Sequence, residues 1–212
     1  LLGQIALEQI EGPIQNHKEG LNRFLKELSG SSLEDLKSWA QFIQTFCPLI
    51  KDLDLESLLS RCLKAAGFLQ TESCFSEFKN ELAQFNWQEF SFSKLQNMAW
   101  EKLLPEWILK ENAYQLDELL PKTLTLPSKR KATIHYPFNQ SPWIQSRIQD
   151  FFGLKETPKV LKGKLLLTLH LLAPNQRAIQ VTQDLAGFWK NHYPQIRKEL
   201  SRRYPRHAWP EV

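Results

Sequence analysis

Apolar residues recur at helical spacing through most of the first 120 positions of the chain. The spacing i, i+3, i+4, i+7 puts side chains on one side of a helix. It is met by Leu21, Phe24, Leu25 and Leu28, and again by Leu33, Leu36, Trp39, Ala40 and Ile43. We expect further helices at about 54–66, 74–84, 91–103 and 111–119. Leu2–Ile10 instead alternates imperfectly, and we interpret it as the last strand of a preceding module.

The pattern changes after Pro121, where short runs alternate between apolar and polar residues. Thr123–Leu126 and Ala132–Tyr136 predict a β-hairpin whose tip carries Lys129, Arg130 and Lys131. Lys164–Leu172 and Ala178–Thr182 predict a second hairpin, with Arg177 in its turn. Between the hairpins, a serine followed by a proline starts an apolar stripe that runs to Gly153. This stripe predicts an amphipathic helix that begins after Ser141 and crosses a small antiparallel sheet.

The last thirty residues predict two helices and an extended tail. Thr182 or Asp184 can cap a helix that carries Leu185 and Phe188. Pro194 opens the next helix, which runs through Arg203 until Pro205 ends it. The expected fold class is α+β: a strand remnant at 1–12, a helical module at 13–117, and a basic α+β module with an extended tail at 118–212.

Bulk composition excludes several classes of protein. No apolar run approaches the roughly 20 residues of a membrane-spanning helix. Leu1-Leu2-Gly3 is too short and uncharged for a signal peptide, and because no methionine precedes it we expect a piece of a longer protein. Cys47, Cys62 and Cys74 are odd in number and lack a C-x-x-C spacing, which argues against disulfides and zinc and favours a reducing cytoplasm.

Charge divides the chain into two unlike halves. Residues 1–120 carry 11 Lys and Arg against 18 Asp and Glu, whereas residues 121–212 carry 16 against 5. The net charges are therefore −7 and +11. Such a division is typical when only one half faces a polyanion such as nucleic acid. The other possibility is a basic surface that docks on the acidic half or on another protein.

Basic and aromatic residues are interleaved toward the end of the chain, as in surfaces that neutralise phosphates and stack on bases. The candidate nucleic-acid-binding residues are Lys129, Arg130, Lys131, Arg177, Arg197, Lys198, Arg202, Arg203, Tyr204, Arg206 and Trp209. Tyr204 and Trp209 have two open interpretations, base stacking or a C-terminal strap that packs on its own domain. Trp189 and Trp143 are expected to be structural, and His135 and His170 to be ordinary sheet histidines. No residue is assigned to catalysis or to a metal.

Several sequence words in this basic half resemble one family. Gln180–Trp189 and Arg197–Pro210 are similar to V-T-x-D-L-A-x-F-W and R-Y-P-x-H-x-W-P, which close the bacterial HrpB-type helicases, DEAH-box ATP-dependent RNA helicases. Leu116–Ser128 resembles L-D-E-L-x-P-x-x-L-x-V-P-S, Phe151–Pro158 resembles F-G-L-x-x-T-P, and Leu169–Pro174 resembles L-H-L-L-S-P. The likeness covers about residues 116–210. It departs at Lys129, where the family usually has glycine, and at Ala178, where it often has proline.

The resemblance implies an auxiliary region that follows two RecA-like motor domains. The chain has no G-x-x-x-x-G-K-[ST] phosphate loop and no D-E-x-H motif, so we expect ATP and Mg²⁺ to bind the parent helicase and no cofactor to bind here. The expected role is to hold single-stranded RNA by its backbone, with little sequence specificity, in the cytoplasm. The alternative is a protein-interaction or structural module whose basic face docks on the motor or a partner. The pattern predicts no oligomeric state.

Overall fold

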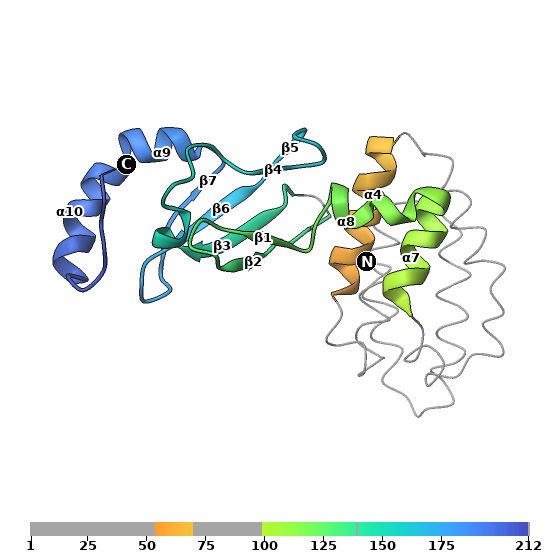
Figure 1. The fold of residues 1–212 in the computed structure, drawn as a ribbon, viewed down its shortest axis with the longest axis horizontal. Coiled ribbons are helices and arrows are strands. Elements are labelled where there is room, and N and C mark those ends of the chain that lie inside the picture. Colours follow the sequence, from red (N-terminus) through yellow and green to blue (C-terminus); the bar gives the residue numbers. More distant parts are fainter. Residues whose placement is uncertain (1–53, 70–98, 139, 212) are drawn as a thin grey trace, which may run out of the picture. The chain divides into compact units, whose positions relative to one another are not determined.

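The computed structural model describes residues 54–69, 99–138 and 140–211 (Figure 1). The chain separates into two compact units, Leu1–Leu116 and Asp117–Val212, and each is considered by itself. The module division expected from the sequence lies one residue later, between 117 and 118. The expected strand at 2–10, the helices expected at 21–28, 33–43 and 74–84, and most of the helix expected at 91–103 lie outside the described residues. Among the described residues, no helix is both long and apolar enough to cross a membrane.

The first unit is helical where it is described. Helix α4 (Leu55–Leu69) begins where the Asp54 carboxylate accepts a 2.9 Å hydrogen bond from the Ser57 amide, and it confirms the helix expected at 54–66. It packs against α7 (Trp100–Leu109). Helix α7 continues past residue 103, where we expected a helix to end, because packing of its buried Leu104 and Ile108 offsets the hydrogen bond that Pro105 cannot donate.

The segment expected as a helix at 111–119 is less regular than predicted. A 3₁₀-helix, η3 (Lys110–Gln115), follows α7 directly, and a single α-helical turn, α8 (Leu116–Leu119), comes after it. The boundary between the two units falls inside α8, because the second unit begins at Asp117.

The second unit is built on small sheets. Strands β1 (Thr123–Thr125) and β2 (Lys131–Thr133) pair antiparallel. A three-stranded sheet has the order β3-β6-β7, and a short pair lies between its first two strands in the chain. Their bounds are β3 (Trp143–Arg147), β4 (Lys159–Val160), β5 (Leu165–Leu166), β6 (Thr168–Leu172) and β7 (Ala178–Thr182). Both predicted hairpins and the α+β class are confirmed.

The helix predicted after Ser141 is wrong. Trp143–Arg147 forms β3, and only Ile148–Phe151 is helical, as the 3₁₀-helix η4. Burial alternates along β3, with Ile144 and Ser146 buried and Gln145 exposed, so the period is two residues instead of 3.6. Strand β3 also runs parallel to β6, so the sheet is mixed and not antiparallel as expected.

The core of the second unit lies on one face of this sheet. Ile144, Leu169 and Leu171 are fully buried, as are Ile148 of η4 and Leu185 of α9. Helix α9 (Leu185–Asn191) begins at the predicted cap, where the Asp184 carboxylate accepts a 2.8 Å hydrogen bond from the Gly187 amide. Helix α10 (Tyr193–Arg203) follows with Pro194 in its first turn, and the chain then runs back along α10 (Figure 1).

Candidate nucleic-acid interface

The two hairpins of the second unit end in the same kind of turn. In Leu126–Arg130, the Lys129 amide donates to the Leu126 carbonyl at 2.8 Å, and the Leu126 amide donates to the Arg130 carbonyl at 2.9 Å. In Ala173–Arg177, the Gln176 amide donates to Ala173 at 2.9 Å, and the Ala173 amide donates to Arg177 at 2.8 Å. Each turn has proline second, serine or asparagine third, and arginine fifth, so each presents an arginine from the same position.

Sheet topology brings the two tips to one end of the unit. Strands β3 and β6 are parallel, with Arg147 opposite Leu172. The segments that follow them, η4 and the turn after β6, therefore lie at the same end of the sheet. The first tip reaches η4 because Arg130 pairs with Asp150 at 3.9 Å. Any side chain on Gly153, which has a φ of +98°, would contact Pro127 of this tip. This end of the sheet therefore gathers four cations and is named here the basic edge. They are Lys129, Arg130, Lys131 and Arg177.

Most cations of the basic edge are unpaired within the described part of the chain. Lys129, Lys131 and Arg177 are exposed and form no ion pair with any described residue. Arg130 pairs with Asp150, which is 13% exposed, but its own side chain remains 51% exposed. All four guanidinium and ammonium groups can thus reach an anion.

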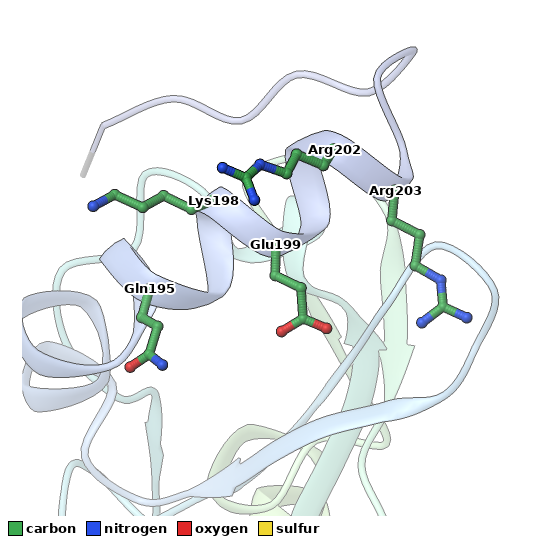
Figure 2. Close-up of a pocket in the computed structure, with 5 residues that line it drawn as sticks. All are labelled: Gln195, Lys198, Glu199, Arg202 and Arg203. Atoms are coloured by element: carbon green, nitrogen blue, oxygen red, sulfur yellow. The ribbon is translucent and has the colours of Figure 1, made fainter.

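A second group of cations lines an open groove of about 500 Å³ along α10 (Figure 2). Its five lining residues recur at helical spacing and are Gln195, Lys198, Glu199, Arg202 and Arg203. Lys198 and Arg202 point along one side of the helix, and Glu199 and Arg203 along the other. The lining thus contains three cations and one carboxylate, and none of the four forms an ion pair within the described residues. The groove is therefore suited to an anionic ligand.

The C-terminal tail packs back on α10. The Tyr193 hydroxyl donates to the Pro210 carbonyl at 2.9 Å, and Arg197 Nε donates to the Trp209 carbonyl at 2.8 Å. Arg197 also pairs with Glu211 at 2.7 Å. Burial raises the pKa of the Tyr193 phenol, and the positive charge of Arg197 opposes that rise. Arg197 thus serves the tail, while the other predicted cations of α10 lie in the groove.

Tyr204 and Trp209, the two candidates for base stacking, are both half-buried in this tail. Trp209 Nε1 donates to the Tyr204 carbonyl at 3.0 Å, and the Tyr204 amide donates to Leu200 at 2.7 Å. The guanidinium of Arg203 lies 5.9 Å from the centre of the Tyr204 ring, whereas Arg206 is exposed. These contacts are those of a strap. The predicted structural role of Trp189 has similar support, because the ring is buried and Nε1 donates to the Leu154 carbonyl at 2.8 Å.

Two features of the second unit were not predicted. Lys155, Lys159 and Lys162 add exposed cations on the long connection between η4 and β6, and their charge was the only signal in the sequence. His135 and His170 stack on Trp143, which we had expected to be core. Strand alternation at Trp143 and Gln145 would have revealed that arrangement.

A family model, a curated protein and two solved structures that this chain resembles are all HrpB helicases. The family described as "ATP-dependent helicase C-terminal", HrpB_C, matches residues 82–212. The ATP-dependent RNA helicase HrpB of Escherichia coli is 39% identical over 97 residues, which is 46% of this chain and 12% of that protein. A crystal structure of the E. coli DExH-box NTPase HrpB matches 74% of this chain and 20% of its own, with a TM-score of 0.62 and 30% identity. A second, of the E. coli DEAH/RHA helicase HrpB, matches 86% and 24%, with a TM-score of 0.55 and 27% identity.

Proposed function

Because the chain belongs to the HrpB family, as a C-terminal accessory region of an HrpB-like ATP-dependent helicase, we propose that its second unit holds single-stranded RNA by the phosphate backbone. The chain spans only 12% of the length of the curated relative it matches, so the motor activity belongs to the proposal and not to these residues. ATP and Mg²⁺ act in the parent helicase, in the cytoplasm, and this region binds neither.

One observation carries the proposal: at two surfaces of the second unit, several cations form no ion pair with any described residue. The basic edge supplies Lys129, Lys131 and Arg177, and the groove along α10 supplies Lys198, Arg202 and Arg203. Residues 117–212 carry 16 Lys and Arg against 7 Asp and Glu, a net charge of +9. Phosphates attract such cations without regard to base sequence, which gives affinity without sequence readout.

Salt dependence of RNA binding tests the proposal. A fluorescent single-stranded RNA is titrated with the chain at several salt concentrations, and log affinity is plotted against log salt. Each neutralised phosphate contributes a slope of about −0.7. Reversing Lys129, Arg130 and Lys131 to Glu removes up to three contacts, so affinity drops and the slope flattens by about 2. Reversal of Arg202, Arg203 and Arg206 tests the groove and the tail in the same way.

A matched control is Lys102→Glu, on α7 of the first unit, where the exposed lysine pairs with Glu106 at 3.8 Å. This reversal leaves RNA affinity unchanged if the contacts lie where proposed. If the chain does not bind RNA at low salt, or if neither triple reversal changes its RNA affinity, the proposal is wrong. The basic surface would then be assigned the alternative role of docking on protein.

A further inference from the structure

The sheet β3-β6-β7 buries one face and leaves the other open. Ile144, Leu169 and Leu171 on the buried face have no exposed surface. The open face carries the intervening residues, among which Gln145 is exposed and Val181 is 50% exposed. Register places Gln145, His170 and Val181 side by side in one row across the three strands. The next row contains Thr168, whose hydroxyl accepts a 2.9 Å hydrogen bond from the Gln183 amide.

Three aromatic rings form a column on this open face. His135 stacks on Trp143 with ring centres 3.9 Å apart and an interplanar angle of 15°. His170 stacks on Trp143 at 4.7 Å and 28°. The two histidines belong to the segments on either side of β3, since His135 bridges to Trp143 and His170 lies on β6. The column therefore runs across the strands, and its next position, beyond His170, lies over Val181 of β7.

The open face continues toward the basic edge. Lys131 and Thr133 alternate with buried Ala132 and Ile134, so they lie on the same side of their strand as His135. The antiparallel bridge between His135 and Trp143 then directs Lys131 toward the end of β3 that carries Arg147. One face thus combines a stacked column in its middle with cations at one end.

We propose that this face binds the bases of single-stranded RNA, with one base stacked on His170 above Val181. The inference rests on the proposed function, because the phosphates of the same strand lie at the basic edge. Stacking platforms on a sheet beside a cationic border are a recurrent way of holding unpaired bases. The side-chain amide of Gln183, which donates to Thr168 in the next row, borders the position and offers donors and acceptors to a base edge.

Charge selects RNA over a protein strand as the occupant. A protein strand would pair with the β7 edge through backbone hydrogen bonds and would gain nothing from Lys131, Arg147 and the two tips. A nucleic-acid strand uses both the rings and the cations, because its bases are flat and its linkers are anionic.

The test uses neutral substitutions, so that electrostatic binding is left intact. The whole chain binds a 12-nucleotide single-stranded RNA that contains one 2-aminopurine, whose fluorescence falls when it stacks, and inorganic polyphosphate serves as a polyanion without bases. His170→Ala and Val181→Ala each weaken RNA binding, by about 5- to 100-fold for the ring. They reduce the fluorescence change, keep the salt slope, and leave polyphosphate affinity unchanged. His170→Phe restores binding because it keeps a flat ring.

The matched control is Tyr114→Ala, which removes a ring that is 80% exposed in the first unit and has no effect. Val181 is half-exposed, so its truncation tests the face even where His170→Ala disturbs folding. RNA binding that keeps its salt slope but is indifferent to His170→Ala and Val181→Ala overturns this inference and leaves the proposed function standing. Failure of both RNA and polyphosphate to bind overturns both.

Discussion

Lys129 and Gln176 occupy the same left-handed position in the two hairpin turns, each with a φ of 67°. This conformation costs a residue with a Cβ about 1–2 kcal/mol, and glycine adopts it freely. With lysine at position 129, the turn keeps its left-handed backbone and also carries a cation. An arginine follows this position in both tips, and its amide donates at 3.3 Å to the side chain of Ser128 or Asn175.

Lys129→Gly separates stability from binding at this position. The free energy of unfolding is expected to rise by about 0.5–1 kcal/mol as the strain is relieved, measured by urea unfolding. RNA affinity is expected to fall and the salt slope to flatten by about 0.7, because one cation is lost. Lys129→Ala removes the same charge without relieving the strain, so it should lower affinity alone. Equal stability of the two variants would contradict the argument.

Helix α10 and the tail behave as one element. Arg197 and Tyr193 bind tail carbonyls at one end, and Trp209 binds the Tyr204 carbonyl at the other. Prolines at 205 and 210 prevent the tail from forming a helix, so these side-chain bonds replace the backbone bonds that a helix would make. Among the described residues, no hydrogen bond joins the tail to the side chains of Lys198, Arg202 or Arg203, which line the groove.

Trp209→Ala is expected to loosen the tail and to leave RNA binding nearly unchanged. Loss of the indole hydrogen bond and of half-buried ring area costs about 1–2 kcal/mol of local stability. Hydrogen exchange should therefore speed up by about 5- to 30-fold at the His207 amide, which donates to the Tyr204 carbonyl at 3.1 Å. Arg206→Ala is the control for a tail residue without such a bond. Unchanged exchange with a large loss of RNA affinity would instead make Trp209 a stacking platform.

At the scale of the whole molecule, charge and compactness divide the chain in nearly the same place. The unit at 117–212 holds net positive charge and contains its own sheet and buried core. Its first residues also belong to it, because the Leu119 carbonyl accepts from the Leu161 amide at 2.8 Å and the Pro121 carbonyl accepts from the Tyr136 hydroxyl at 2.7 Å. A hydrophobic core of its own is the property of a domain that can fold alone.

Residues 117–212 are therefore expected to fold without the first unit. Thermal unfolding followed by circular dichroism should show one cooperative transition, as in small domains of about 100 residues. A shorter fragment, 122–212, lacks the Leu119 and Pro121 carbonyls and buried Leu120, so its transition should occur at a lower temperature. A broad, non-cooperative transition in the longer fragment would show that the unit depends on the rest of the chain.

Local chemistry was sufficient for much of this architecture. Proline and a serine or asparagine at 127–128 and 174–175 predict the two hairpin turns, and Asp184 predicts the start of α9, because each depends on neighbouring residues alone. The charge division and the family resemblance also follow from sequence. These features locate the basic residues along the chain and assign them to turns, a helix and a tail.

Only the tertiary structure decided which segments pair and which cations remain available. Trp143–Arg147 has apolar residues compatible with either a helix or a strand, and its parallel pairing with Thr168–Leu172 selects the strand because the hydrogen-bond partners are remote in sequence. The same pairing aligns the two tips and forms the partly exposed His135–Trp143–His170 column. Arg197 is committed to the tail through contacts with Trp209 and Glu211 that no local pattern encodes. Pairing between distant residues is a property of the packed chain, and it determined the geometry of the candidate interface.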